Sequence, residues 1–337
     1  MRPVTRRWRV GIVGASGYGG GELLRLCARH PSFEIAWVGG ETSVGQRLEE
    51  RFPAFSGSPS GQLRVERFEP ENTAGLDLLF VSLPTGKSRE PLARVPPSVR
   101  VVDVGGDHRF VEGWEYGLTE LPGRRERIAR AFRVANPGCY PAAALLALAP
   151  LVREGLVETE GIVVDAKSGV SGAGRGATAD FGYVETNEDV HAYGLEGHVH
   201  VPEMQNALAA LAHQPVHIAF TPHLVPMSRG ILATCYARPR GAVDAARLYE
   251  AAHALYRDEA FVRVCPLERG RSPHTRWARA SNLAFLAYAV NAQTGWVVAT
   301  AAIDNLGKGA AGQALQNANL MTGQPETTGL EALPLWT

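Results

Sequence analysis

The sequence has few cysteines, and it has no apolar run near the roughly 18 residues that span a bilayer. Its four cysteines are far apart and form no CxxC pair, and no histidines stand at zinc-finger spacing. These absences exclude a disulfide-stapled scaffold and a zinc finger. The basic N-terminus holds only a short apolar run, so we predict no signal peptide. We therefore predict a cytoplasmic protein with reduced thiols and no metal site.

The chain also has no excess charge of either sign, because 34 Lys and Arg balance 34 Asp and Glu. A globally basic nucleic-acid-binding protein is therefore not expected, and there is no internal repeat or low-complexity tract. What is present is the composition of an ordinary α/β protein, with 45% hydrophobic residues, 37 Gly and 22 Pro. The length of 337 residues predicts about two domains.

Strand-like segments alternate with helical patterns in the N-terminal part of the chain. A helix is predicted at residues 20–29, and strands are predicted at residues 9–13, 33–38, 76–83 and 100–104. This rhythm predicts parallel βαβ units, and hence a Rossmann-type nucleotide domain over residues 1–145. A final helix at about residues 307–322 is predicted to pack back on it.

The pattern changes after an apolar helical segment at residues 142–151. Strand-like segments are then separated by long irregular stretches and by a helical segment at residues 243–257. These strands are predicted at residues 161–166, 216–221, 230–237, 283–290 and 296–302. We predict a second, α+β domain over residues 146–306, built on a mainly antiparallel sheet and used for catalysis and oligomerisation.

A glycine-rich segment, GASGYGG at residues 14–20, lies between the first predicted strand and helix. In a βαβ unit this position binds a dinucleotide: Gly14 permits the tight turn, and Gly17 admits the pyrophosphate beside a helix N-terminus. The GxxGxxG spacing and the further Gly21 leave open which glycine does which job. A plain strand-to-helix turn is the alternative.

The end of the second predicted strand is where such domains bind the adenosine ribose. An acid there favours NAD, and Glu41 is present, but Thr42, Ser43 and Arg47 offer hydroxyls and positive charge. The residues leave the choice between NAD and NADP open.

Cys139 stands in NPGCYP, residues 136–141, directly before the apolar helix. Pro141 suits a first helical turn, which places the thiol at a helix N-terminus. There the helix dipole lowers a thiol pKa from about 8.5 and makes a thiolate nucleophile available. The alternative is a small buried hydrophobe, which is our expectation for Cys27, Cys235 and Cys265.

A partner base is predicted in EGHVHVPEM, residues 196–204. If this segment is extended, its alternation points His198 and His200 to one side, where Glu203 can orient an imidazole. A metal half-site and a structural histidine pair are the alternatives.

An anion-binding loop is predicted in KSGVSGAGRG, residues 167–176. Its amides, hydroxyls and guanidinium suit a phosphate or a carboxylate. Arg109, which follows a predicted strand, is a second candidate cationic arm.

Six segments, in this order, resemble the N-acetyl-gamma-glutamyl-phosphate reductases, a family of semialdehyde dehydrogenases in arginine biosynthesis that reduce acyl phosphates. They are GASGY (14–18), VANPGCYP (134–141), DAKSGVSGAGR (165–175), GHVHVPE (197–203), FTPHLVPMSRGIL (220–232) and AIDNLGKGAAGQALQN (302–317). The resemblance covers essentially the whole chain. It implies that NADPH reduces N-acetyl-gamma-glutamyl phosphate to N-acetylglutamate 5-semialdehyde, with release of phosphate, in a homodimer or homotetramer.

The resemblance also implies roles for single residues. Cys139 is the nucleophile that forms a thioacyl intermediate, His200 is the acid/base, and Glu203 supports it, although the choice between His198 and His200 stays open. Substrate contacts are implied for Arg109, Asn136, His198 and Arg175. Cofactor contacts are implied for Gly14, Ser16, Gly17, Tyr18, Gly19, Thr42, Ser43, Pro84, Ser168, Gly169 and Asn305.

The chain departs from the family's pattern at several positions. Ala142 and Gly19 stand where threonine is usual, and Val199 stands where arginine usually separates the two histidines. Residues 85–88 read TGKS rather than HGVS, and residues 105–109 read GGDHR rather than SADFR. None of these changes removes Cys139, His200 or Arg109.

Three other functions stay open at this point. One is a reductase of lysine biosynthesis that acts on a carrier-protein-bound aminoadipyl phosphate. Another is a further acyl-phosphate-reducing enzyme, such as an aspartate-semialdehyde dehydrogenase. The third, from a different class, is a nicotinamide-binding sensor without turnover.

Overall fold

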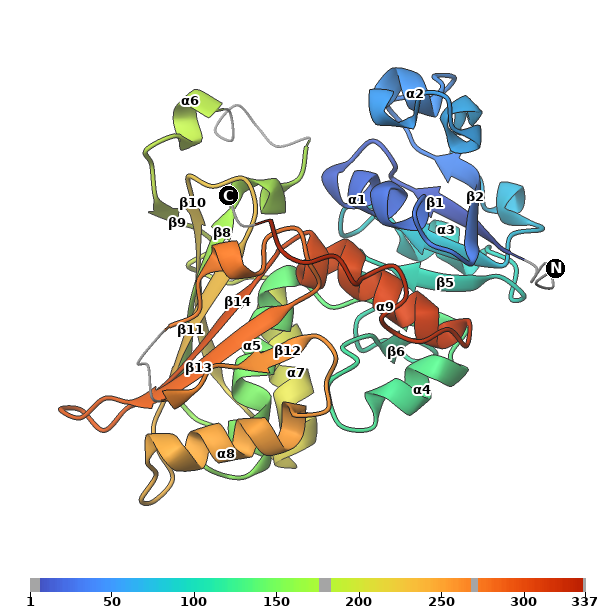
Figure 1. Cartoon of the computed structure of the whole chain (residues 1–337). Helices are drawn as coiled ribbons and strands as arrows, with labels where there is room; N and C mark the ends of the chain where they lie inside the picture. Colours follow the sequence, from blue (N-terminus) through green and yellow to red (C-terminus); the bar gives the residue numbers. More distant parts are fainter. Residues whose placement is uncertain (1–6, 176–182, 268–271, 336–337) are drawn as a thin grey trace. The chain divides into compact units, whose positions relative to one another are not determined.

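The computed structural model describes residues 7–175, 183–267 and 272–335 (Figure 1). The chain divides into two compact units. Unit 1 comprises Met1–Pro137 and Ala310–Ala332, and unit 2 comprises Gly138–Gly309 and Leu333–Thr337. The chain therefore passes from unit 1 to unit 2 immediately before Cys139.

Unit 1 is built on a parallel sheet of seven strands in the order β3-β2-β1-β4-β5-β7-β6. The strands are β1 (Trp8–Val13), β2 (Phe33–Gly39), β3 (Val65–Glu66), β4 (Leu78–Val81), β5 (Arg100–Asp103), β6 (Glu115–Tyr116) and β7 (Arg133–Ala135). The central strands β1 and β4 are buried almost throughout because helices follow them in βαβ units. Each strand predicted in this part of the chain is present.

The helices of unit 1 come from both ends of the chain. The α-helices are α1 (Tyr18–Cys27), α2 (Leu48–Arg51), α3 (Arg89–Ala93), α4 (Arg124–Arg130) and α9 (Gly312–Met321), and there are short 3-10 helices at Pro53–Phe55, Pro59–Gln62 and Pro70–Thr73. Helix α9 contacts α1, α4 and β5. Its buried amide side chains hydrogen-bond inside the unit: Asn317 donates to the carbonyl of Gly117 (2.8 Å), and Gln313 donates to the hydroxyl of Thr119 (3.1 Å).

Unit 2 is built on a mixed sheet of seven strands in the order β12-β13-β14-β11-β8-β10-β9. Its strands are β8 (Ile162–Gly169), β9 (His191–Ala192), β10 (Ile218–Val225), β11 (Ile231–Ala237), β12 (Val262–Val264), β13 (Ala284–Val290) and β14 (Val297–Ile303). Only the β8/β10 and β12/β13 pairs are parallel, so the sheet is mainly antiparallel. The predicted fold class, a Rossmann-type domain with a second α+β domain, is confirmed.

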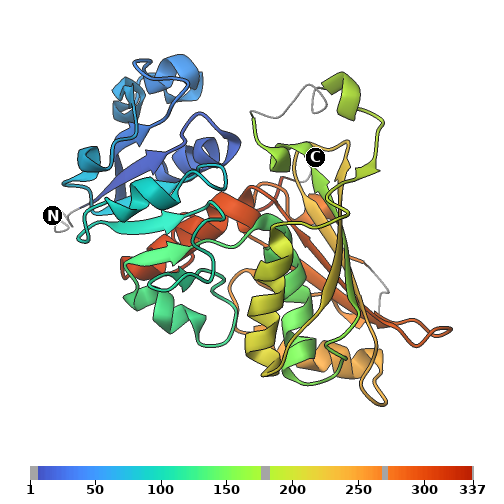
Figure 2. The same cartoon turned by 180° about the vertical axis from the view of Figure 1, so that it is seen from behind.

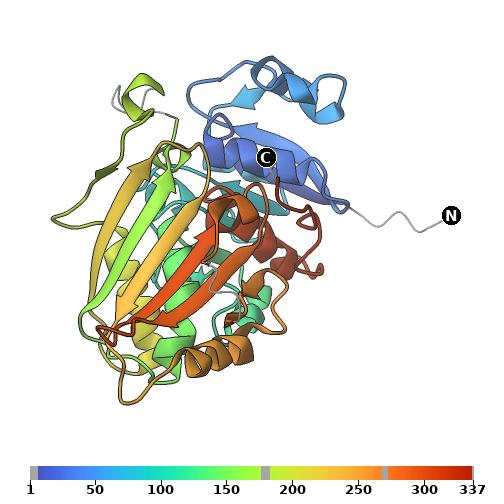
Figure 3. The same cartoon turned by 60° about the vertical axis from the view of Figure 1, so that its left-hand side comes forward.

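Helices cover one face of this second sheet. They include α5 (Cys139–Arg153), which contacts β11 and β14, α7 (His200–Ala212), which packs beside it, and α8 (Ala245–Tyr256); Figure 2 shows α5 and α7 side by side. The unit also has the short α-helix α6 (Tyr183–Thr186), the 3-10 helices Val170–Ala173 and Thr275–Trp277, and a π-helix that begins at Gly307. Burial alternates along β8, β10 and β11, so every second side chain points to the opposite face. Figure 3 shows that no α-helix within the described ranges covers that face.

Helix α7 corrects one prediction. The segment with His198 and His200 was expected to be extended, but Val199 has φ −58° and ψ −19°, and the helix begins at His200. The helix forms because Pro202 is tolerated in a first turn and the following apolar residues Met204, Ala207 and Leu208 repeat at helical spacing on the buried side. No helix in the described parts of the chain is both long and apolar enough to cross a membrane.

Candidate active site

Cys139 is the first residue of α5, and the extended Gly138 caps this helix. Pro141 lies in the first turn, as predicted, and the amide of Ala142 donates to the carbonyl of Gly138 (2.9 Å). The thiol is half-buried and is not part of a disulfide. The sulfur therefore lies at the positive end of a fifteen-residue helix, an environment that stabilises a thiolate.

The other three cysteines have different surroundings. Cys27 and Cys235 are buried, and burial raises the pKa of Cys27 far above its ordinary range and that of Cys235 to about 12. Cys265 was expected to be buried as well, but it is half-buried because it follows the edge strand β12. Burial still raises the pKa of its thiol. Of the four cysteines, Cys139 is the one at a helix N-terminus.

His198 and His200 lie side by side, although not for the predicted reason. Their ring centroids are 4.7 Å apart because α7 starts between them, and Nδ1 of His198 accepts a hydrogen bond from the amide of His200 (3.1 Å). This bond leaves Nε2 of a neutral His198 as a donor. Within the described ranges, no group of three or more His, Cys, Asp or Glu side chains is arranged to hold a metal ion.

The neutral state of His198 is favoured by its surroundings, because burial lowers its pKa below the ordinary 6.5. The unfolded chain therefore takes up this proton first as the pH falls, so the contribution of His198 to stability is present above pH 6.5 and is lost as the pH falls through the folded-state value. We expect the free energy of unfolding of His198→Asn to depend less steeply on pH below 6.5 than that of wild type. Denaturant unfolding at a series of pH values measures both slopes, and equal slopes would contradict the prediction.

Glu203 joins the two helix N-termini of the site. It lies in the first turn of α7 and is only 4% exposed, and its Oε1 accepts a hydrogen bond from the amide of Gly138 (2.8 Å). The carboxylate thus holds the residue that precedes Cys139. The predicted support of His200 by Glu203 stays a prediction.

Two tyrosines complete the surroundings of Cys139. Tyr140 donates to the carbonyl of His223 (3.0 Å), and Tyr193 donates to the Tyr140 hydroxyl (3.2 Å). Burial raises the pKa of both phenols, that of Tyr193 to about 12, and the charge of Cys139 raises both further. The phenols are therefore neutral donors beside the sulfur, and His198 packs edge-on against both rings.

Sequence reasoning missed Tyr193. It follows the two-residue strand β9 in an irregular stretch, and no local spacing connects it to Cys139. Only the pairing of β9 with β10, and the hydrogen bond from its amide to the carbonyl of Pro222 (3.1 Å), bring it to the site.

The predicted anion-binding loop begins at the end of β8. Ser168 is buried, and its hydroxyl donates to the carbonyl of Gly169 (3.0 Å). Gly169 must be glycine, because a Cβ there would lie 2.7 Å from the carbonyl of Met227. Arg175 is exposed at the end of a described range, and Gly176, the last residue of the predicted loop, lies outside the described residues.

Asn305 has both ends of its amide occupied within unit 2. Its Oδ1 accepts from the amide of Gly230 (2.7 Å), and its Nδ2 donates to Oγ of Ser171 (2.8 Å). The side chain is 2% exposed and fixes the loop after β8 to the turn before β11. Its predicted contact with the cofactor stays a prediction.

Arg109 belongs to unit 1, where it contacts the chain that leads to Cys139. Its Nε donates to the carbonyl of Asn136 (2.9 Å). The residues on either side of Arg109 have stacked rings. The ring centroids of His108 and Trp114 are 3.9 Å apart, and those of Phe110, which has φ +57°, and Tyr116 are 4.5 Å apart. These two stacked pairs fix the turn that contains Arg109.

Asn136 is fully buried. Its Nδ2 donates to the carbonyl of Ala310 (3.1 Å), and its Oδ1 accepts from Asn317 (3.0 Å). The structure thus gives this side chain a positioning role in unit 1, and the implied substrate contact stays a prediction.

The structure resolves which glycines the loop after β1 requires. Gly14 has φ +78°, and a Cβ there would lie 2.1 Å from the carbonyl of Ser82. A Cβ on Gly20 would lie 2.1 Å from the carbonyl of Gly14, whereas Gly17 and Gly21 have room for one. Gly14 therefore makes the turn, Gly20 allows the helix to pack against it, and Gly17 caps α1, where a Cβ would lie 3.4 Å from the carbonyl of Gly14. This cradle fits a dinucleotide pyrophosphate.

Other predicted cofactor residues lie around this loop. The hydroxyls of Ser16 and Thr42 are 3.3 Å apart, which joins the glycine loop to the end of β2. A Cβ on Gly19 would meet Oγ of Ser82, in the loop after β4 that also carries the exposed Pro84. Tyr18 is partly exposed and Ser43 is buried. Thus the ends of β1, β2 and β4 converge, as expected for a nucleotide site at the carboxyl ends of parallel strands.

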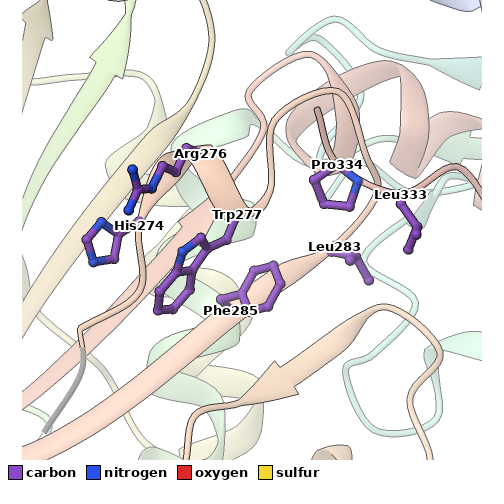
Figure 4. A pocket seen from close by; sticks show the side chains of 7 residues that line it. All are labelled: His274, Arg276, Trp277, Leu283, Phe285, Leu333 and Pro334. Carbon is purple, nitrogen blue, oxygen red and sulfur yellow. The ribbon is translucent and has the colours of Figure 1, made fainter. Parts of the chain in front are cut away.

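Unit 2 also has a cavity of about 810 Å³, which none of the predicted catalytic, substrate-binding or cofactor-binding residues lines (Figure 4). The rings of Trp277 and Phe285 meet edge to face in it, with centroids 5.7 Å apart. Its lining residues are His274, Arg276, Trp277, Leu283, Phe285, Leu333 and Pro334. The lining is mostly apolar and has no nucleophile, so this cavity is not the candidate active site.

Both units match known domains. Residues 9–131 match the family model described as "Semialdehyde dehydrogenase, NAD binding domain", and residues 139–305 match "Semialdehyde dehydrogenase, dimerisation domain". The fold is similar to that of aspartate semialdehyde dehydrogenase II from Vibrio cholerae, with a TM-score of 0.73 at 17% identity over 95% of this chain and 99% of that one. It is also similar to the aspartate semialdehyde dehydrogenase from Candida albicans, with a TM-score of 0.72 at 15% identity over 94% and 98% of the chains. The fold and the cysteine site define a semialdehyde dehydrogenase with a nicotinamide-nucleotide-binding domain.

Relatives with curated names identify a family within this class. A protein from a Bradyrhizobium species named N-acetyl-gamma-glutamyl-phosphate reductase is 54% identical over 329 residues, or 97% of this chain and 99% of the relative. One of the same name from Salinispora arenicola is 46% identical over 96% of this chain and 98% of the relative. The chain belongs to the N-acetyl-gamma-glutamyl-phosphate reductase family, and the resemblance drawn from its six segments is confirmed.

Proposed function

We propose that this chain reduces N-acetyl-gamma-glutamyl phosphate to N-acetylglutamate 5-semialdehyde, with release of phosphate, as a step of arginine biosynthesis. The observation that carries the proposal is the position of Cys139 at the N-terminus of α5, next to Tyr140, whose ring contacts the rings of both His198 and His200, in a chain of this family. A nicotinamide-binding sensor without turnover needs the glycine loop but not this cysteine site.

The chemistry begins with the Cys139 thiolate. It attacks the acyl carbon and forms a carbon–sulfur bond, while the bond to the phosphate oxygen breaks and phosphate leaves with that electron pair. When bound, the nicotinamide cofactor supplies the hydride that reduces the thioester carbon. An imidazole, which we assign to His200, protonates the resulting oxyanion and takes the proton back as the carbon–sulfur bond breaks, so that aldehyde and thiolate are released.

The tyrosines and His198 support this chemistry as neutral groups. The phenol protons are donated to the His223 carbonyl and to the Tyr140 hydroxyl, so the donor offered to substrate is the Nε2 proton of a neutral His198. Burial disfavours the charged forms of all three groups. A site of this kind stabilises negative charge that develops near the sulfur without competing for the transferred proton.

We further propose NADPH as the reductant and a homodimer or homotetramer as the assembly. The exposed Thr42, beside Ser16, offers a hydroxyl at the ribose end of the nucleotide site, but Glu41 is exposed there too, so NADPH is taken from the family resemblance. For the assembly, the face of the second sheet that carries no α-helix within the described ranges is suited to pairing with a second copy. The family model that matches this unit is described as a dimerisation domain. A cytoplasmic location stays a prediction from the sequence.

The proposed function is tested by following oxidation of NADPH and of NADH with two substrates, N-acetylglutamyl phosphate and carrier-bound aminoadipyl phosphate. We expect turnover with the first substrate and faster turnover with NADPH. Turnover with the aminoadipyl substrate alone would place the chain in lysine biosynthesis instead. A sensor would oxidise neither cofactor and would release no stoichiometric burst of phosphate on mixing with the acyl phosphate.

A further inference from the structure

Gly309 lies directly against the candidate nucleophile. A Cβ built on it would be 2.8 Å from Cβ and 3.2 Å from Cα of Cys139. Both distances are shorter than the ordinary contact range of 3.4–4 Å. The backbone of Gly309 does not adopt a positive φ. Glycine is therefore needed here for space beside Cys139 and not for a special turn conformation.

The turn that carries Gly309 is organised by Asp304. This carboxylate is fully buried, and its Oδ1 accepts from the amides of Leu306 and Gly307 (both 2.8 Å). The main-chain carbonyl of Asp304 accepts from the amide of Gly309 (2.9 Å). The position of Gly309 is thus fixed through the main chain of residues 304–309.

Arg229 holds Asp304 from the other side. Its Nε donates to Oδ2 (2.9 Å) and its Nη2 to Oδ1 (3.0 Å), a two-point pair that fixes both charge and orientation. Oδ2 also accepts from the amide of Ala280 (2.5 Å). Arg229 and Asp304 therefore join three loops of unit 2, one of which presses on Cys139.

We propose that Gly309 is a positioning residue for Cys139, and that the Arg229–Asp304 pair holds the turn that places it there. The inference rests on the proposed function insofar as Cys139 is the nucleophile. Gly309 sets how far the first turn of α5 can approach residues 304–309, and so where the sulfur lies at the helix N-terminus.

The main test is Gly309→Ala. The added methyl group has to separate from Cys139 by roughly 1 Å to restore an ordinary carbon contact. Because a displacement of about 1 Å costs about 10²-fold in rate, we expect kcat to fall by about that factor with a smaller change in KM. The pH midpoint of Cys139 alkylation by iodoacetamide should shift as well, since alkylation reports the thiolate. Gly21→Ala is the matched control, because the nearest atoms to its Cβ are 3.5 Å away.

The second variant tests the support of the turn. Arg229→Lys keeps the charge but loses the two-point geometry, so we expect a smaller loss of kcat and a smaller shift of the alkylation midpoint. Arg257→Lys is its control, because the Arg257–Asp258 pair is exposed at the surface. Melting temperatures are measured for all four variants, and peptide mass spectrometry identifies the alkylated thiol.

Each outcome decides the proposal. A folded Gly309→Ala variant with the kinetics and alkylation profile of Gly21→Ala overturns it. If Gly309→Ala does not fold, a folded Arg229→Lys variant with the wild-type alkylation profile overturns it, and a shifted profile supports it. Alkylation of Cys139 needs no substrate, so it still tests the geometry if Cys139→Ser retains turnover and the proposed function fails.

Discussion

Cys139→Ser is expected to abolish acyl-phosphate reduction while leaving NADPH binding intact. A serine hydroxyl stays protonated at neutral pH, and the helix N-terminus that stabilises a thiolate does not make an alkoxide available. Removal of the covalent nucleophile costs about 10⁶ in kcat in a serine protease, which sets the scale of the loss. NADPH oxidation with N-acetylglutamyl phosphate measures turnover, and a fluorescence titration measures cofactor binding.

Cys265→Ser is the matched control for this variant. Cys265 is half-buried like Cys139, but it lies after β12 and not at a helix N-terminus, and burial raises its pKa. We expect this variant to turn over like wild type. If Cys139→Ser still releases phosphate and oxidises NADPH at a substantial rate, the thioester route is wrong.

The first sheet was predictable because its information is local. The strands β1, β2, β4 and β5 are apolar segments with helices or turns between them, and buried parallel strands have this pattern. The strands β3, β6 and β7 have two or three residues each, too few to show any periodicity. Similarly, Pro141 was enough to predict a helix N-terminus beside Cys139, although α5 begins at Cys139 itself and not at residue 142.

The start of α7 was not predicted because two patterns compete in residues 196–204. The alternation of His198, Val199 and His200 is typical of a strand, but Pro202 and the apolar spacing after it favour a helix. The helix forms because Met204 and Leu208 gain burial on the side facing α5 and the sheet. The amide that the helix start leaves unpaired is then bound by His198.

The remaining features of the site depend on distant segments. Tyr193 meets Tyr140 only through the pairing of β9 with β10, and Gly309 meets Cys139 only because β14 leads into the turn beside α5. The glycine loop also depends on a distant segment, although part of its role was visible in the sequence. Its sequence shows several glycines, but the carbonyls of Gly14 and Ser82 decide that Gly14 and Gly20 are the ones that cannot change.

Substitution of His200 is also expected to cause a large loss of kcat. In the neutral state Nδ1 of His198 is occupied by the amide of His200, and burial lowers the pKa of His198, so this ring is suited to donate a hydrogen bond and poorly suited to gain a proton. His200 is then the better candidate for the acid/base. We expect His200→Asn to lower kcat by roughly 10²–10⁴, the usual contribution of a positioned acid/base. His198→Asn should raise KM for the acyl phosphate more than it lowers kcat.

Steady-state kinetics of both variants over a range of pH separate the two roles. If His200 transfers the proton, one limb of the kcat profile disappears in His200→Asn and persists in His198→Asn. The double variant adds a further check. If the two residues act in the same step, its loss of kcat is smaller than the product of the losses in the two single variants. A loss of kcat and of the pH limb in His198→Asn, with both retained in His200→Asn, would exchange the two assignments. The hydrogen bond between the His200 amide and His198 would then have to break during the reaction, since Nδ1 of a protonated His198 cannot accept it.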